Sequence, residues 1–303
     1  MNLHVNLAPN RDGGLVLRNP VMTAAGPYGY GREAMRAVDL SPLGAFVTRT
    51  TTLYPQAGGS LPRLAQAPAG VLHNIGWPNP GLGSVLKEYA PRWQTWSLPV
   101  ILSVAGQSAA ECATIGRQVE DAPGLAGVEL NLSLAPREDG LPAGYDAAQS
   151  WALVRALRET CSLPMLAKLP LRLPGLAEVV QAVMLAGADA VTLVAALPGL
   201  TVDVKRKRVS MFGGLSGPAV RPVVLRAVYE VAREVPGVPL VAAGGVSCGE
   251  DAAGYLLAGA TAVQVGWATL ADPRAAIAVL SELEKYLGEN GIQEISELTG
   301  AAL

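Results

Sequence analysis

The chain has 303 residues, of which 50% are hydrophobic and 16% charged, and its formal net charge at pH 7 is −2. This composition predicts a large buried core and offers no basic surface to nucleic acid or to an anionic membrane. The first residues have no cationic segment followed by an apolar run, so we expect no signal peptide. The sequence has no charge-free apolar run of about 18 residues, and its three cysteines form neither a metal motif nor a disulfide framework. We therefore expect a cytoplasmic protein with no metal and with no nucleic-acid or membrane partner.

Eight short apolar runs alternate with longer amphipathic stretches. The runs are residues 21–26, 45–50, 100–106, 127–133, 164–170, 190–196, 239–245 and 262–269. Each is almost continuously apolar, which is typical of parallel strands buried on both faces. Helical spacing of apolar residues marks the stretches 109–120, 146–160, 175–188 and 218–235. The alternation predicts an α/β fold, a (β/α)8 TIM barrel over residues 1–303 as a single domain, and a doubly wound open sheet is the alternative.

Two longer insertions interrupt this alternation. Residues 55–81, rich in glycine and proline, follow the second run, and residues 201–214 follow the sixth. Both leave the carboxyl end of a predicted strand, so we expect extra loops at the face where barrels gather their active sites. The second insertion contains the basic sequence KRKR (205–208), which we expect to be a solvated loop or the tip of a hairpin.

Polar residues also gather at the predicted strand ends. Arg49 ends the second run, Asn131 and Ser133 the fourth, and Lys168 lies within the fifth. A lysine in an apolar run is costly to bury without an anionic or hydrogen-bonding partner. Lys168 is thus either a functional group at the mouth of the barrel or half of an internal ion pair, and we favour the functional role.

Glycine-rich motifs follow the late strands. GGLSGPAV (213–220) leads into a helix, AAGGVSCGED (242–251) ends the seventh run, and VGWATL (265–270) ends the eighth. Backbone amides at helix amino termini after the seventh and eighth strands bind phosphate in many barrels, and glycine allows the phosphate close to the backbone. These motifs predict a phosphorylated cofactor or substrate, and AAGPYGYG (24–31) offers a third patch of open backbone.

Several stretches resemble, in order and over almost the whole chain, the serial motifs of one family. They read NPVMTAAGPYGYG, LGAFVTRTTTLYPQAGGSLPR, NIGWPNPG, VELNLS, LAKLP, GGLSGPAVRPVVL, AAGGVSCGEDA and LAGATAVQVGWA. The family is the first class of dihydroorotate dehydrogenases. The resemblance implies a barrel that carries flavin mononucleotide (FMN) and oxidises a small molecule, dihydroorotate, to orotate in pyrimidine biosynthesis. It also implies a homodimer and, for some members, an electron-transfer partner subunit that is an iron–sulfur flavoprotein.

The cofactor half of the site matches the family well. Lys168 corresponds to the lysine that approaches flavin N1 and steadies the reduced, anionic ring. The cofactor-binding set implied by the resemblance is Ala25, Gly26, Thr50, Asn131, Lys168, Gly217, Gly244, Gly245, Gly266 and Trp267. Trp267 departs from the pattern, because the family usually has a threonine there that hydrogen-bonds the phosphate, and we expect the larger side chain to crowd that position.

The substrate half departs from the family. Leu134 occupies the position of the cysteine that serves as general base, and a leucine side chain cannot accept a proton. Pro136, Ala195 and Ala196 replace polar residues that bind the pyrimidine. Each polar group of the ligand left unpaired costs about 1–3 kcal/mol, so we expect orotate to bind poorly.

Other residues are candidates to serve a changed substrate. Arg49, in place of a lysine, suggests an anionic group on the substrate, and His73, in place of an asparagine, is a candidate proton carrier near neutral pH. Acidic residues and Tyr145 in the segment 137–145 are further candidates for a substitute base. The predicted substrate-binding set is Arg49, His73, Gly76, Trp77 and Asn131, and the predicted catalytic residues are Lys168, Arg49 and His73.

Three functions remain open at this point. The favoured one is an FMN-dependent oxidoreductase acting on a substrate less polar than dihydroorotate. The second is a genuine dihydroorotate dehydrogenase with a substitute base. The third is a non-catalytic, flavin-binding partner protein.

Overall fold

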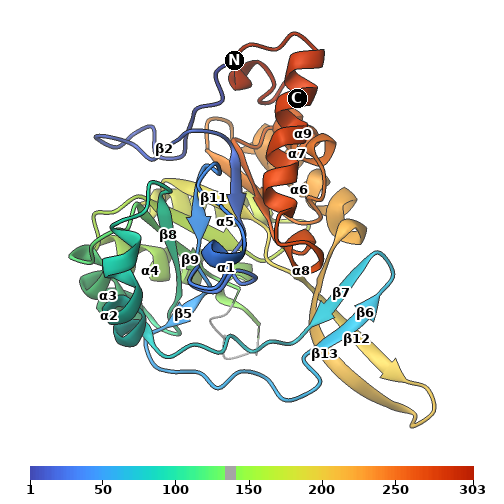
Figure 1. Ribbon diagram of the computed structural model, residues 1–303. Coiled ribbons are helices and arrows are strands. Elements are labelled where there is room, and N and C mark those ends of the chain that lie inside the picture. The colour runs from blue at the N-terminus through green and yellow to red at the C-terminus, as the bar shows by residue number, and fades with distance from the viewer. Residues whose placement is uncertain (134–140) are drawn as a thin grey trace.

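A ring of parallel strands forms the centre of the computed structural model, which describes residues 1–133 and 141–303 (Figure 1). Neighbouring strands follow the order β3–β15–β14–β11–β10–β9–β8–β4, and β5 also pairs with β8. The bounds are β3 (Val21–Thr23), β4 (Phe46–Val47), β5 (Thr51–Thr52), β8 (Val100–Ala105), β9 (Gly127–Asn131), β10 (Met165–Leu169), β11 (Ala190–Leu193), β14 (Leu240–Ala243) and β15 (Ala262–Val265). A parallel bridge between Met22 of β3 and Ala45, the residue before β4, joins the two ends of this order. The TIM barrel is confirmed and the open sheet is wrong, because the two ends of the sheet meet.

Helices pack around the outside of this ring, with α2, α3 and α4 on one side in Figure 1 and α6, α7 and α9 on the other. The bounds are α1 (Ala34–Ala37), α2 (Leu82–Trp93), α3 (Ala109–Glu120), α4 (Ala147–Arg158), α5 (Leu176–Leu185), α6 (Arg221–Glu234), α7 (Gly249–Leu257), α8 (Ala268–Ala271) and α9 (Ala275–Glu289), with 3-10 turns at Ala143–Tyr145 (η1), Pro218–Val220 (η2) and Ile295–Glu297 (η3). The four helices predicted from apolar spacing are all present. Side-chain caps start two of them, since Ser108 accepts from Glu111 N and Asp146 accepts from Gln149 N. Within the described residues, no helix is long and apolar enough to cross a membrane.

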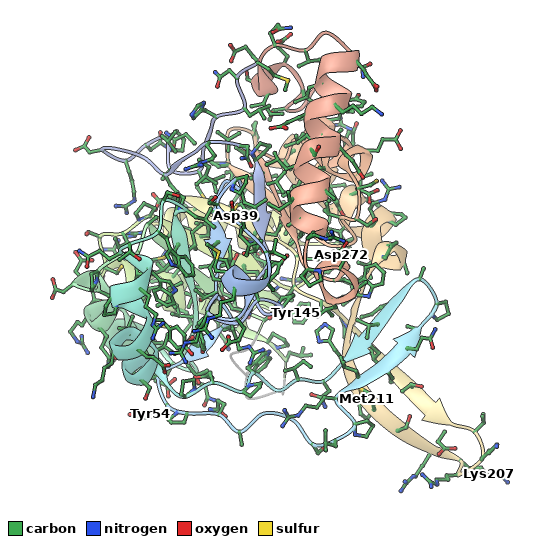
Figure 2. The ribbon with its side chains drawn as sticks, in the orientation of Figure 1. Asp39, Tyr54, Tyr145, Lys207, Met211 and Asp272 are labelled. Carbon is green, nitrogen blue, oxygen red and sulfur yellow. The ribbon has the colours of Figure 1, made fainter. Side chains whose placement is uncertain are left out.

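The two insertions combine into a second, antiparallel sheet. It contains β6 (Leu64–Ala67), β7 (Gly70–His73), β12 (Leu197–Asp203) and β13 (Arg208–Ser216), in the order β12–β13–β7–β6. The basic segment lies at the turn between β12 and β13, and Figure 2 shows Lys207 at the outer end of this hairpin. The prediction of a hairpin tip is therefore confirmed, whereas the pairing of β7 with β13 had not been foreseen.

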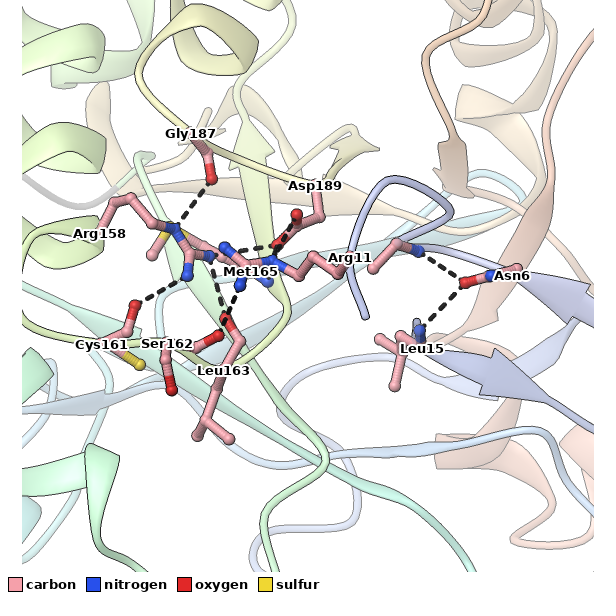
Figure 3. A network of polar contacts seen from close by, with 11 residues as sticks. Asn6, Arg11, Leu15, Arg158, Cys161, Ser162, Leu163, Met165, Gly187 and Asp189 are labelled. Carbon is pink, nitrogen blue, oxygen red and sulfur yellow. Dashed lines mark hydrogen bonds and ion pairs between the residues drawn. The ribbon is translucent and has the colours of Figure 1, made fainter. Parts of the chain in front are cut away.

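A polar network ties the amino-terminal segment of the chain to the barrel at the end where the strands begin (Figure 3). That segment includes a small antiparallel pair, β1 (Val5–Asn6) and β2 (Val16–Leu17). Arg11 Nε lies 2.7 Å from both carboxylate oxygens of Asp189, and Asp189 Oδ2 also accepts from Met165 N and from Arg158 Nη2. Met165 begins β10 and Asp189 directly precedes β11, so this network lies at the amino ends of the strands. The amino ends of the strands are thus covered by stabilising contacts, and we look for the active site at their carboxyl ends, where barrels place it.

Candidate active site

A buried chain of hydrogen bonds joins the second, third and fourth barrel strands at the carboxyl end. Asn131 Nδ2 donates to Thr50 Oγ1 at 3.2 Å, and Thr50 Oγ1 lies 2.9 Å from Ser103 Oγ. Asn131 Oδ1 accepts from both the backbone N–H and the hydroxyl of Ser133, at 3.1 and 2.6 Å. These partners fix the orientation of the Asn131 amide, because its oxygen and its nitrogen are both engaged. The structure therefore brings two predicted cofactor residues, Thr50 and Asn131, together.

Lys168 lies beside this chain, since it pairs with Asn131 across β9 and β10. Its side chain is buried, its Nζ donates to Gln264 Oε1 at 2.8 Å, and the same Nζ lies 3.7 Å from Glu129 Oε1. The position at the strand ends agrees with the expected functional role, and the ion pair of the alternative interpretation is also present. The two interpretations are compatible, because a charge held at the mouth of a barrel needs a counter-charge beneath it.

Glu129 and Gln264 are not among the site residues predicted from the sequence. The Glu129 side chain is fully buried, and its Oε2 accepts from Thr192 Oγ1 at 3.0 Å and from Gln264 Nε2 at 2.6 Å. A signal for Glu129 was available, since it is a charged residue inside an apolar run, as Lys168 is. Gln264, likewise polar in an apolar run, bridges the two charges with its amide.

The predicted phosphate-binding glycines meet where the late strands end. Gly245 has a φ of +71°, and a β-carbon added there would lie 2.9 Å from the carbonyl oxygen of Gly217. A β-carbon added at Gly266 would lie 3.1 Å from Ala24 Cβ, and Ala24 N donates to Val265 O. The loop after β14 therefore packs directly against the loop after β13, and the loop after β15 against the loop after β3. Glycine is needed at Gly245 for both reasons, the left-handed backbone and the close approach.

Two aromatic residues adjoin these glycines, and one of them contacts the loop after β14. The Tyr255 hydroxyl donates to the carbonyl of Gly244 at 2.5 Å and holds that loop against α7. Trp267 immediately precedes the short helix α8, is half-buried, and packs against the hydrophobic core. Packing against the core therefore gives this tryptophan, which replaces the threonine usual in the family, at least part of its role.

The predicted substrate residues come from both sheets: Arg49 and Asn131 lie at the ends of barrel strands, His73 lies on the second sheet, and Gly76 and Trp77 lie in the loop that follows it. His73 ends β7, and its Nε2 lies 3.0 Å from Ser216 Oγ. Burial lowers the pKa of His73, which favours the neutral imidazole at pH 7. A β-carbon added at Gly214 would lie 3.3 Å from the His73 ring and 2.6 Å from Ala196 Cβ, so the ring lies near the end of β11. His73 is thereby close to a position where the family has a polar substrate ligand.

Arg49 and Trp77 are more open to solvent. Arg49 is half-buried, and its Nη1 lies 3.4 Å from the carbonyl oxygen of Pro78. Trp77 is exposed and follows Gly76, and both have positive φ angles in the loop before α2. Leu134 and Pro136 lie outside the described residues.

Among the residues that the structure describes, no group of three or more histidine, cysteine and acidic side chains is placed to hold a metal ion. The donors gathered at the mouth are instead one ammonium, hydroxyls, an amide and glycine-rich backbone, a set suited to an anionic, hydrogen-bonding organic group.

Known proteins resemble this chain over nearly its full length. The dihydroorotate dehydrogenase family pattern matches residues 11–287. The chain is 43% identical over 293 residues to the dihydroorotate dehydrogenase B (NAD(+)) catalytic subunit of Desulforudis audaxviator, with 95% of each chain covered. Proteins of the same name from Geotalea uraniireducens and Desulforamulus reducens are 39% and 38% identical, with 96% and 99% of each chain covered. With a matching barrel and a matching family pattern, the chain belongs to the dihydroorotate dehydrogenase family.

Proposed function

We propose that this protein is an FMN-dependent oxidoreductase. The observation that carries the proposal is the buried Lys168 ammonium at the carboxyl end of the barrel, next to the hydrogen-bonded pair Asn131 and Thr50. A fixed positive charge in a buried site stabilises negative charge that develops during reduction. FMN, when bound, supplies the acceptor for a hydride and so makes the site an oxidising one.

The residues present fit FMN. The backbone at Gly217, Gly244, Gly245 and Gly266 would hold the phosphate, because residues without side chains allow a phosphate close to the backbone amides. Gly26 has a φ of +122° and no atom within 4 Å of an added β-carbon, so the patch with Ala25 is open to a flat ring. Lys168, Asn131 and Thr50 would hydrogen-bond the ring.

We infer further that the substrate is not dihydroorotate. Oxidation of that ring removes a hydride from C6 and a proton from C5, and Leu134 offers no base for the proton. Ala195 and Ala196 leave the pyrimidine without polar partners. An anionic group near Arg49 and an apolar body near these alanines agree better with the residues present, and His73, kept neutral by burial, is the candidate proton carrier.

One observation favours a second candidate, a dihydroorotate dehydrogenase with a substitute base. The relatives at 38–43% identity are named as catalytic subunits of dihydroorotate dehydrogenase B, and the similarity covers at least 95% of each chain. In this case His73 would take the proton, with Ser216 as its hydrogen-bonding partner.

The absorbance spectrum of the purified protein, followed by titration with FMN, tests the cofactor. Flavin bands or saturable uptake of FMN support the proposal, and a colourless protein that takes up no FMN refutes it. Because the cofactor contacts come from several loops, the titration is done on the full chain.

Dihydroorotate-dependent reduction of a dye distinguishes an enzyme with a changed substrate from a dihydroorotate dehydrogenase with a substitute base. We expect turnover in the wild type to be lower by about 10²–10⁴-fold than in a family member with its base in place. Leu134→Cys alone should help little, whereas Leu134→Cys with Pro136→Asn and Ala195→Asn should help more than the separate changes combined, because these residues act as a unit. Ordinary family-level turnover in the wild type would refute the changed substrate, and its loss in His73→Asn would then assign the base.

We infer that the chain works with an electron-transfer partner. The relatives are named catalytic subunits, which implies a further subunit in those proteins. The β12–β13 hairpin also exposes large apolar side chains, namely Leu200, Val202, Val204, Val209 and Phe212. The FMN-loaded chain alone should then reduce a dye but not NAD⁺, and efficient NAD⁺ reduction by the isolated chain would refute this arrangement. The mass in solution shows whether the chain is also a homodimer.

A further inference from the structure

Glu129 is the deepest charged group of the site. Its side chain is 0% exposed, and its Oε2 accepts hydrogen bonds from Thr192 and Gln264. Its Oε1 is buried and accepts no hydrogen bond from any described residue, but it lies 3.7 Å from Lys168 Nζ. A buried carboxylate oxygen without a donor is costly, so the nearby ammonium is its main compensation.

The register of the strands places Glu129 beneath Lys168. Lys168 pairs with Asn131 on β9 and with Thr192 on β11, whereas Glu129 precedes Asn131 by two residues on β9. Residues two apart on a strand point to the same face, so Glu129 lies one layer further from the carboxyl ends than Asn131. The ammonium therefore has a carboxylate on its inner side and the mouth of the barrel on its outer side.

Gln264 fixes this arrangement. Its Nε2 donates to Glu129 and its Oε1 accepts from Lys168, so the amide has one orientation that satisfies both charges. Among the described residues, this is the one hydrogen bond that the Lys168 ammonium donates. The remaining donors of the ammonium are thus available toward the mouth.

We propose that Glu129 is a positioning residue that acts through Lys168. Its carboxylate holds the ammonium at the mouth and cancels part of its positive field, and this sets how strongly the site favours the reduced, anionic form of a bound flavin over the oxidised form. The inference rests on the proposed FMN cofactor. Removing the negative charge should leave the field of Lys168 uncompensated, so reduced FMN should bind more tightly relative to oxidised FMN.

The test is the reduction potential of bound FMN, measured by equilibration with a reference dye, in wild type, Glu129→Gln and Glu129→Asp. We expect Glu129→Gln to raise the ratio of affinities for reduced and oxidised FMN about tenfold, which is about 30 mV for a two-electron couple. Glu129→Asp keeps the charge but withdraws it from Lys168, so a smaller rise is expected. Glu289→Gln is the matched control, because it removes an exposed carboxylate far from the site and should leave the potential unchanged.

Each outcome bears on the inference. A potential that is unchanged or lower in FMN-loaded Glu129→Gln, or in Glu129→Asp where the first variant does not fold, overturns the role of Glu129 and leaves the FMN proposal intact. A rise of the same size in Glu289→Gln also overturns it, because the effect would then be one of net charge. Wild-type protein that takes up no FMN overturns the proposed function, and this inference with it.

Discussion

Replacing Lys168 by methionine should destabilise the protein even without any cofactor. The change removes the ammonium from the buried pair with Glu129, whose oxygen lies 3.7 Å away. At an effective dielectric constant of about 20, the attraction over that distance is about 4.5 kcal/mol. Loss of one partner of a buried pair typically costs about 3–5 kcal/mol, because the other charge stays buried and uncompensated. We therefore expect the free energy of unfolding to fall by about 4 kcal/mol.

The chain offers a matched control at the same separation. Lys285 Nζ also lies 3.7 Å from a carboxylate, that of Glu289, but both side chains are largely exposed. Exposed pairs contribute about 0–1 kcal/mol, so Lys285→Met should change stability by less than about 1 kcal/mol. Because the nitrogen–oxygen distance is the same in the two ion pairs, a difference in their effect on stability is due to the difference in burial.

Urea denaturation of the FMN-free protein measures both variants. The double variant Lys168→Met/Glu129→Gln should recover most of the loss, since no charge then remains buried and the amide oxygen still accepts from Thr192. Two results would refute the reasoning: a Lys168→Met protein within 1 kcal/mol of the wild type, or a double variant no more stable than Lys168→Met.

Three further predictions concern titration and the glycine loop. Burial raises the thiol pKa values of Cys112 and Cys161 to about 12 and about 11, so both should react slowly with a thiol reagent at pH 8 in native protein and quickly after denaturation; rapid native labelling would contradict this. Burial lowers the pKa of His73 below 6.5, so below about pH 6.5 the unfolded chain binds more protons than the folded protein, and the free energy of unfolding should fall as the pH falls. Urea denaturation should show a smaller fall in this free energy from pH 7 to pH 5 in His73→Gln than in the wild type, and equal falls would argue against the effect. Gly245→Ala adds an atom against Gly217 at a positive φ and should weaken FMN binding at least about tenfold, whereas Gly237→Ala, with a φ of +83° and open space, should bind FMN as the wild type does.

Local sequence patterns determined the elements and their order. Continuous apolar runs indicated buried parallel strands, and three-to-four spacing indicated the helices, because burial on both faces or on one stripe leaves its mark along the chain itself. The glycine motifs likewise identified the backbone patches after the late strands. Lys168 was recognised as a residue that needs a partner, because the cost of burying an ammonium does not depend on knowing the fold.

The partners themselves were decided by the tertiary structure. Lys168 and Gln264 are 96 residues apart, and Glu129 and Gln264 are 135 apart, so their contact depends on strand register and barrel closure. His73 meets Ser216 across 143 residues because the two insertions share one sheet. A sequence records what each residue needs locally, such as burial, a charge partner or a positive φ. Which distant residue meets that need is fixed when the parallel strands align side by side and the ring closes.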